Sequence, residues 1–221
     1  MDDHIIFHID VNSAYLSWSA LKLLEEGASV DIRTIPAIVG GDQKTRHGIV
    51  VAKSIPAKAC GIHTAETVAS ALKKCPDLLM VPPDHTYYRK KSRMLMEYLS
   101  GICPCIEQVS GGECYMDYEP IRGKYGTPEE TAAFLKDSVR EKFGFTVNVG
   151  ISDRKVLAKM ASDFKKPDLV HTLYVREIRE KLWPLSIDSL HMCGKSSAGL
   201  LKKMGIRTIG DLAETDKTMV E

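Results

Sequence analysis

The 221-residue sequence has no long hydrophobic run and almost no excess of charge of either sign. No apolar stretch approaches the roughly 20 residues that a membrane span needs, and the acidic start Met1-Asp2-Asp3 lacks the basic and then apolar layout of a signal peptide. Thirty basic and twenty-nine acidic residues give a net charge of +1, so a contact with nucleic acid must depend on local basic clusters. These absences favour a cytoplasmic protein without membrane contact.

Cysteine pairs with metal-binding spacing are also absent. The six cysteines include no CxxC pair and are too sparse for a disulfide scaffold, so buried reduced thiols are expected. Cys103 and Cys105 are close together, but no two further ligands at zinc spacing accompany them. The sequence has no internal repeat, low-complexity tract or heptad run. With 44% hydrophobic residues, it can bury the core of one large domain or of two to three small ones.

Alternating polarity near the N-terminus predicts a strand that ends in a carboxylate. Apolar and polar side chains alternate over residues 4–10, and Asp10 closes the strand. A helix follows, with Ser13 as its expected N-cap and an end near Gly27.

Two strand-like runs come next, at residues 35–39 and 49–52, separated by a turn-forming and basic stretch over residues 40–48. This part is typical of a small α/β insertion with its own fold.

From residue 78 onward the predicted elements follow the order βαββαβ, the split pattern of ferredoxin-like folds. They are a strand at 78–81, a helix at 85–100, strands at 105–109 and 113–118, a helix at 128–143 and a strand at 145–150. The second helix is well marked, because Thr127 can cap it, Pro128 suits its first position and Glu130 completes a capping box. An apolar stripe predicts a further helix over residues 154–165.

The segment from Leu190 to Leu212 resembles a helix-hairpin-helix unit, in which a glycine turn directs backbone N–H groups toward a DNA phosphate. Gly194 and Lys195 lie at that turn as candidate DNA-binding residues, and Met192 replaces the first glycine of the usual pattern. An ordinary pair of helices with a glycine turn explains the segment equally well.

Residues 109–117, Val-Ser-Gly-Gly-Glu-Cys-Tyr-Met-Asp, form the most informative pattern. Carboxylates at strand ends hold the magnesium ions that phosphoryl transfer requires, and Asp10 and Glu113 would supply two of them. Taken singly, each is more typical of a turn residue or a solvated hairpin acid. The pattern resembles the hairpin of the Y-family, translesion DNA polymerases, in which an Asp stands at the position of Gly112.

This resemblance extends over nearly all of residues 4–213 and implies an α+β fold with three parts. A ferredoxin-like βαββαβ palm would comprise residues 1–13 and 81–173, a small α/β fingers insertion residues 14–80, and a partial helical thumb residues 174–221. The little-finger domain of such polymerases is expected to be absent from this sequence.

The resemblance also implies roles for individual residues. Asp10 and Glu113 would be catalytic and would bind Mg²⁺, with the backbone carbonyl of Val11 as a further ligand. Tyr15 would act as a steric gate that excludes a ribose 2′-hydroxyl, although pattern alone favours a core aromatic at this position.

Two lysines would bind the triphosphate of the nucleotide. Lys58 stands where the family has Arg, and it keeps the charge but loses bidentate geometry; Ile55 replaces the family's Tyr nearby. Lys166 belongs to residues 150–167, the closest match in the chain. Without the resemblance, Lys166 is typical of a cation at a helix C-terminus.

Gly112 is the departure with the largest expected consequence. The loss of one of three carboxylates removes a negative charge and a bridging ligand from a site for two Mg²⁺ ions, so activity is expected to be impaired. Without the family pattern, Gly111-Gly112 is typical of a tight hairpin turn.

Three functional hypotheses follow. The first is a template-directed DNA polymerase that transfers nucleotides from dNTP to a primer 3′-OH in translesion synthesis and DNA repair. It would act as a monomer on primer-template DNA, with a sliding clamp contacted through a C-terminal region absent here. The second is a catalytically silent DNA-binding relative. The third is a nucleotide cyclase with paired carboxylates on a βαββαβ sheet, which the fingers insertion and the helix-hairpin-helix segment disfavour.

Overall fold

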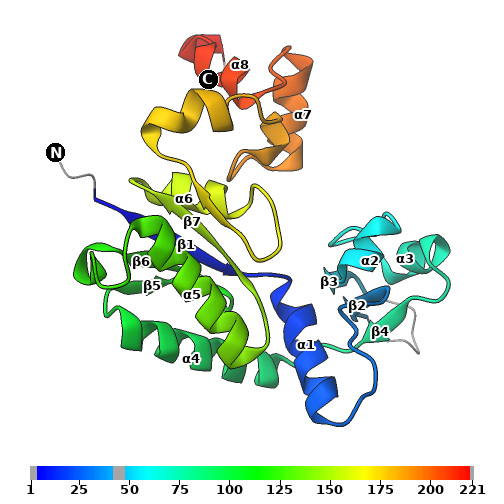
Figure 1. The fold of residues 1–221 in the computed structure, drawn as a ribbon. Helices are drawn as coiled ribbons and strands as arrows, with labels where there is room; N and C mark the ends of the chain where they lie inside the picture. The colour runs from blue at the N-terminus through cyan, green and yellow to red at the C-terminus, as the bar shows by residue number, and fades with distance from the viewer. Residues whose placement is uncertain (1–3, 42–47, 220–221) are drawn as a thin grey trace.

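A computed structural model describes residues 4–41 and 48–219, which form two β-sheets with surrounding helices (Figure 1). The helices and strands of this part are β1 (Ile6–Val11), α1 (Ala14–Glu25), β2 (Ala37–Gly40), β3 (Val50–Lys53), α2 (Ile55–Ala59), α3 (Val68–Lys74), β4 (Leu79–Val81), α4 (His85–Ile102), β5 (Ile106–Gln108), β6 (Glu113–Asp117), α5 (Pro128–Phe143), β7 (Val147–Ser152), α6 (Lys155–Ser162), β8 (Val170–Thr172), α7 (Lys195–Lys203) and α8 (Ile209–Glu214), with short helical turns between some of them. None of the described helices is long and apolar enough for a membrane span.

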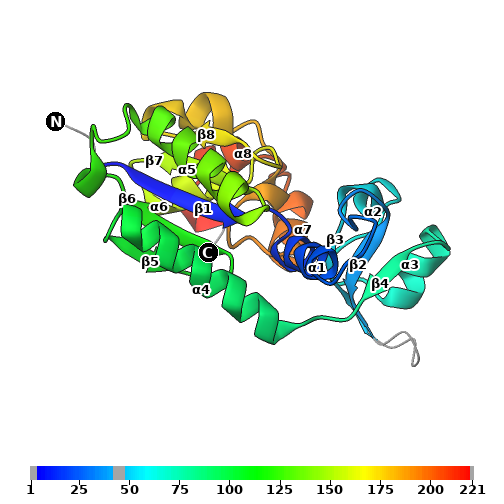
Figure 2. The same ribbon diagram turned by 60° about the horizontal axis from the view of Figure 1, so that its bottom comes forward.

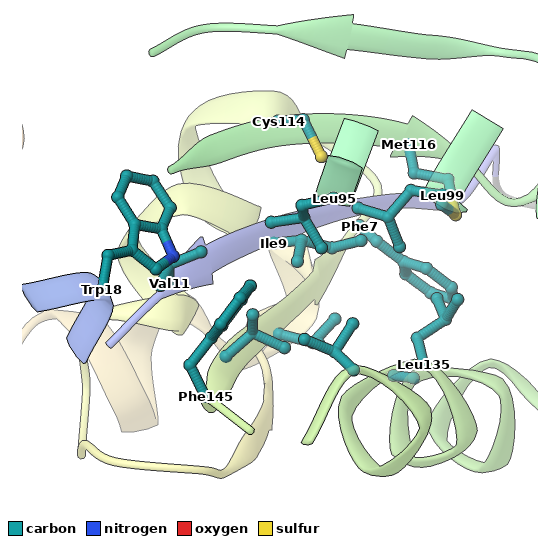
Figure 3. Packing of buried hydrophobic residues seen from close by; sticks show 14 of the residues in the cluster. Phe7, Ile9, Val11, Trp18, Leu95, Leu99, Cys114, Met116, Leu135 and Phe145 are labelled. Carbon is teal, nitrogen blue, oxygen red and sulfur yellow. The ribbon is translucent and has the colours of Figure 1, made fainter. Parts of the chain in front are cut away.

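The larger sheet has the strand order β5-β6-β1-β7-β8, with β1 antiparallel to both β6 and β7. Successive side chains of a strand point to opposite faces, so Phe7 and Ile9 of β1 face helices α4 and α5. There they pack with the buried Leu95, Leu99 and Leu135 of these helices (Figure 3). His8 points to the other face, where its ring contacts Ser162 of α6. One face of β1 therefore contributes to the core with α4 and α5, and the other face is covered by α6.

The smaller sheet corrects one sequence prediction. Residues 78–81 were expected to open the βαββαβ unit, but β4 pairs in parallel with β2 in a separate sheet of order β3-β2-β4. β1 stands next to β6 and β7 in the larger sheet instead. Local polarity predicts that a short run of residues is a strand, but it does not determine which strand it pairs with. Pairing depends on which surfaces become buried when the whole chain folds.

The part around the smaller sheet has a core of its own, built from Ile38, Val50, Ile62 and Val68 with their neighbours. Its two predicted strands lie within two residues of β2 and β3, whereas α2 and α3 were not predicted because they have five and seven residues. Most of the expected basic turn at 40–48 lies outside the described residues. Figure 2 shows this part beside the larger sheet, beyond α1.

Helix ends test the local predictions. The capping box of α5 is confirmed: Thr127 Oγ1 accepts from the Glu130 N–H at 3.2 Å, and Glu130 accepts from the Thr127 N–H at 2.7 Å. Ser13 occupies the N-cap position of α1, but it has φ 45° and its side chain forms no capping hydrogen bond, so that part of the prediction was wrong. The helix predicted at 154–165 ends earlier, at Ser162.

The C-terminal part forms a third core, in which buried residues of α7 and α8 pack with α6. Ala198 and Ile209 contribute from α7 and α8, and Leu157 and Met160 contribute from α6. Met192 precedes α7 with φ 68°, a conformation that favours glycine, and its side chain is 89% exposed. Helix α6 therefore connects the larger sheet to the C-terminal helices.

Gly150 allows α6 to lie unusually close to β7. A Cβ atom at this position would lie 1.9 Å from the carbonyl oxygen of Ala158 and 2.6 Å from the backbone nitrogen of Ser162. Both are backbone atoms of α6, so no side-chain rotation can relieve the contact. A glycine at this point of β7 therefore sets the distance between α6 and the sheet.

We expect Gly150→Ala to lower the free energy of unfolding by about 3 kcal/mol, at the upper end for overpacked cores, because the helix must move away from the strand. Urea denaturation measures this change. Gly199→Ala on α7 is the matched control: its Cβ would meet nothing within 4 Å, so it should be neutral or stabilise by up to about 1 kcal/mol. Equal stability of Gly150→Ala and the unaltered protein would contradict the prediction.

Candidate functional site

A cavity of about 680 Å³ lies where β1 ends, between the β5–β6 hairpin, the end of β3 and the segment after α6. The cavity is lined by the residues expected to bind metal or nucleotide and by the two positions that depart from the family pattern: Asp10, Val11, Tyr15, Ile55, Lys58, Gly112, Glu113 and Lys166. Gly194 and Lys195 lie apart from it, at the exposed start of α7. The structure thus brings together every proposed metal and nucleotide residue and leaves the proposed DNA-binding pair elsewhere.

Asp10 and Glu113 stand directly opposite each other on the antiparallel strands β1 and β6. Residues paired in this way have Cβ atoms about 4.5–5.5 Å apart and point to the same face. The Asp10 carboxylate forms an ion pair with Lys166, which also contacts Asp163 at 2.9 Å. Burial raises the pKa of Asp10 above its usual value, although the charge of Lys166 opposes this. The two carboxylates therefore converge on one cavity.

Glu113 has a different set of partners. Its Oε1 pairs with Lys159 of α6, and its Oε2 accepts a hydrogen bond from Ser110 Oγ at 3.1 Å. Burial by itself raises the pKa of Glu113, but the hydrogen bond and charge of Lys159 outweigh it, and the pKa is lowered. Glu113 is thus held as a carboxylate by a lysine that the sequence analysis did not name.

Two signals could have pointed to Lys159. It lies in the segment 150–167 that matches the family most closely, and it stands outside the apolar stripe of its helix. Lys166 was expected to follow directly on that helix, but it lies four residues beyond Ser162, the last residue of α6. The two lysines neutralise Asp10 and Glu113 from different parts of one continuous segment.

His8 is a further residue that received no role from the sequence. It is fully buried, and its Nδ1 lies 2.8 Å from Ser162 Oγ. Because Ser162 Oγ donates to the Lys159 carbonyl at 2.8 Å, its lone pair accepts from Nδ1–H, and His8 Nε2 is left as an acceptor. That atom has no hydrogen-bond partner in the described chain and lies 3.9 Å from Glu113 Oε1.

Tyr15 forms part of the cavity wall and is partly buried. Its ring stacks on Tyr88, with ring centroids 4.6 Å apart and an angle of 11° between the planes, and it meets His85 edge-on at 5.9 Å. A stacked ring cannot swing freely, so it presents a fixed surface. The stacking on Tyr88 agrees with a core aromatic, and because Tyr15 also belongs to the cavity wall, the steric gate stays a prediction.

The donor set of the cavity suits a hard divalent cation, because carboxylate and carbonyl oxygens are the ligands that Mg²⁺ prefers. Asp10 and Glu113 offer two carboxylates, and Gly112 offers no side chain. The one cluster of three potential ligand side chains in the described residues is His4, Asp117 and Glu119, at the opposite ends of β1 and β6. The residues present therefore fit one ion, and they lack the bridging group for a second.

The surroundings of His8 predict a pH effect on stability. Burial, and then the charge of Lys159, lowers the pKa of His8 from 6.5 to about 4. Between these values the unfolded chain binds more protons than the folded chain, so the free energy of unfolding falls as the pH falls, by up to roughly 3 kcal/mol. Urea denaturation between pH 7 and pH 4 should show this slope, and His8→Gln should remove the part that His8 contributes, leaving the smaller slope of the paired carboxylates. His191→Gln, at an exposed position, should keep it. Identical slopes in His8→Gln and the unaltered protein would show that His8 does not carry the effect.

Comparisons with known proteins match both the chain and its site region. The model of the impB/mucB/samB family matches residues 9–163. DNA polymerase IV of Clostridium acetobutylicum is 47% identical over 218 residues, which cover 98% of this chain and 54% of that protein. DNA polymerase IV of Alkaliphilus oremlandii is 40% identical over 213 residues, covering 96% and 52%. The chain spans about half the length of these relatives.

Solved structures share the fold. DinB from Sulfolobus solfataricus has a TM-score of 0.84 at 24% identity, covering 98% of this chain and 62% of that chain. The insertion ternary complex of Dbh DNA polymerase has a TM-score of 0.82 at 24% identity, with the same coverage. These likenesses confirm the α+β class. Because the family model matches most of the sequence, the resemblance seen in its motifs is confirmed, and the chain belongs to the impB/mucB/samB family.

Proposed function

We propose that this chain acts as a template-directed DNA polymerase that adds deoxynucleotides to a primer 3′-OH in translesion synthesis. The observation that carries the proposal is the pairing of Asp10 with Glu113 in a cavity that also contains Lys58 and Lys166. Family membership supports it, because the relatives named above are DNA polymerases. The same membership disfavours the nucleotide cyclase. Primer-template DNA and dNTP as partners, a monomeric state and a sliding clamp belong to this proposal.

The three-part organisation expected from the family is also part of the proposal. A ferredoxin-like palm at 1–13 and 81–173 is supported by the order β5-β6-β1-β7 and by α4 and α5 on one face. Fingers at 14–80 are supported by the separate core around Ile38. A helix-hairpin-helix in the thumb, 174–221, is supported by the positive φ of Met192. This residue stands where the usual pattern has glycine, and its backbone adopts a conformation that favours glycine.

The residues of the cavity have separable tasks in this reaction. Asp10, Glu113 and the Val11 carbonyl would hold a divalent ion, which when bound supplies positive charge for activating the 3′-hydroxyl and neutralising the phosphates. Lys58 and Lys166 bind phosphate oxygens by charge-assisted hydrogen bonds. Lys166 can do so only after leaving Asp10, so ion binding at Asp10 and phosphate binding at Lys166 favour each other. Tyr15 lies against Tyr88 and blocks space beside the sugar.

A catalytically silent DNA-binding relative is the second candidate, and Gly112 is the observation that favours it. In the metal-binding region, Asp10 and Glu113 are already paired with Lys166 and Lys159, so the formal charges of these four groups cancel. A divalent ion must displace both lysines to bind, and it then gains only two carboxylate ligands instead of three. This competition predicts weak ion binding and slow nucleotide addition in the protein as it stands.

Primer extension with Mg²⁺ separates the two candidates. We expect slow extension by the unaltered chain, and an increase of at least about tenfold in rate and in Mn²⁺ affinity for Gly112→Asp, because a ligand carboxylate is restored. The new Cβ would lie 3.2 Å from Ala14 Cβ and 3.3 Å from Val11 Cβ, so the neighbours must shift by a few tenths of an ångström.

Gly111→Asp is the matched control for that experiment. It adds the same charge one residue away, where a Cβ meets nothing within 4 Å, and it should leave rate and Mn²⁺ affinity nearly unchanged. If neither the unaltered chain nor Gly112→Asp adds a nucleotide, the polymerase proposal is wrong. DNA binding without extension would then support the silent relative.

The proposed DNA contact at the start of α7 has its own test. Lys195→Ala should reduce the slope of log affinity for duplex DNA against log salt concentration by about one, because one phosphate contact is lost. Fluorescence anisotropy at several salt concentrations measures this slope. Lys203→Ala, at the other end of α7, is the control and should leave the slope unchanged. Equal slopes for both variants would favour an ordinary helical pair.

A further inference from the structure

The wall of the cavity opposite Asp10 and Glu113 carries a lysine that the proposed function has not used. Lys53 is the last residue of β3 and lines the same cavity as the two carboxylates. Its Nζ donates a hydrogen bond to Thr64 Oγ1 at 3.0 Å. No carboxylate forms an ion pair with Lys53 or with Lys58 in the part of the chain that the structure describes. Among the described residues, two cations therefore share one wall without an ion-pair partner of their own.

Other charged groups nearby are already engaged. Glu66 pairs with Lys74 at 2.7 Å and accepts from the backbone N–H of His63 at 2.6 Å. Arg33 also lines the cavity, but Asp31 binds its guanidinium at 2.7 Å and the Gly144 carbonyl accepts from its Nη1 at 2.6 Å. Among the described residues that line the cavity from the side of the smaller sheet, Lys53 and Lys58 are thus the cations available to a ligand.

The electrostatics of Lys53 agree with a site for an anion. Burial lowers the pKa of Lys53, the positive charge of Lys58 lowers it further, and the charge of Glu66 opposes both without reversing the shift. Because Glu66 is already paired with Lys74, it only partly offsets the repulsion between Lys53 and Lys58, and a bound anion removes the remaining cost. A triphosphate carries several negative charges and accepts hydrogen bonds from more than one lysine.

We propose that Lys53 is a third phosphate-binding residue, which acts with Lys58 to hold the triphosphate of the incoming nucleotide from the side of the smaller sheet. This inference rests on the proposed function and deepens it. The family resemblance assigned a hydroxyl donor to the position of Ile55, whose side chain is 61% exposed and cannot donate a hydrogen bond. Lys53, two residues earlier on the same cavity wall, supplies the donor that Ile55 lacks.

The distribution of side chains around the cavity gives the nucleotide one orientation. Lys166 lies on the side of the larger sheet, and Lys53 and Lys58 lie on the side of the smaller sheet. Phosphate oxygens between them would be contacted from both sides. The apolar Val51 and Ala52, which precede Lys53 and line the same cavity, suit the sugar and base rather than the phosphates.

Inorganic tripolyphosphate is a probe that tests this site without requiring polymerisation. Its binding to the 221-residue protein is measured by isothermal titration calorimetry for the unaltered chain, Lys53→Met, Lys53→Arg and the control Lys73→Met. Lys73 is an exposed lysine on α3 outside the cavity. We expect about tenfold weaker binding for Lys53→Met, a smaller loss for Lys53→Arg, and no change for Lys73→Met. Thermal unfolding should be the same for all four proteins.

The same four proteins are then titrated with a dNTP in the presence of Mg²⁺. A loss of tripolyphosphate and dNTP affinity confined to Lys53→Met and reduced in Lys53→Arg supports the proposal. Equal tripolyphosphate affinity in Lys53→Met and the unaltered chain overturns it, even if the chain extends primers. If Lys53→Met weakens tripolyphosphate binding but neither the unaltered chain nor Gly112→Asp extends a primer, the anion site stands and the polymerase function fails.

Discussion

Two ion pairs between the larger sheet and the segment 155–166 hold the candidate site together. Two carboxylates about 5 Å apart repel each other by roughly 3 kcal/mol at an effective dielectric constant of about 20. Lys159 pairs with Glu113 and Lys166 pairs with Asp10, so each negative charge has its own cation. Both lysines reach the sheet only because α6 lies against β7, and Gly150 permits that approach. The chemistry of the cavity thus depends on a backbone contact between β7 and α6, the helix that carries Lys159.

Local sequence patterns predicted the helices and strands of this site better than they predicted which strands pair and which side chains meet. Alternation over residues 4–10 placed Asp10 at a strand end, and the hairpin placed Glu113 on the next strand, because side-chain period and turn position are local properties. Local patterns could not show which sheet contains β4, because a strand of only three residues can pair with the edge of either sheet. Lys159 and His8 were missed for a related reason. Their importance comes from residues more than 40 positions away along the chain, which no short window contains.

Gly112 removes a side chain from the site but leaves the backbone in place. Its carbonyl accepts from the Val11 N–H at 2.9 Å, so the hairpin remains fixed to the end of β1. The position is also close-packed, because Val11 and Ala14 stand where a Cβ would lie. A structure that keeps the strand pairing and loses only the carboxylate alters the charge balance without altering the fold. Lys159 and Lys166 then neutralise Glu113 and Asp10, which favours the ion-free state of the site.

The gap between the two walls of the cavity is set by packing rather than by the connecting chain. Along β2, Ala37 and Val39 are buried in the core of the larger sheet, whereas Ile38 between them is buried in the core of the smaller one. The period-two alternation of a strand therefore ties both cores to one element. Trp18 of helix α1 belongs to the same core as Ala37 and Val39, where it packs against Phe145 next to β7. Because β3 pairs with β2, the lysines of the smaller sheet are held at a defined distance from the carboxylates of the larger sheet. A nucleotide bound between them would contact two rigid cores, so the strength of its phosphate contacts depends on how these cores pack.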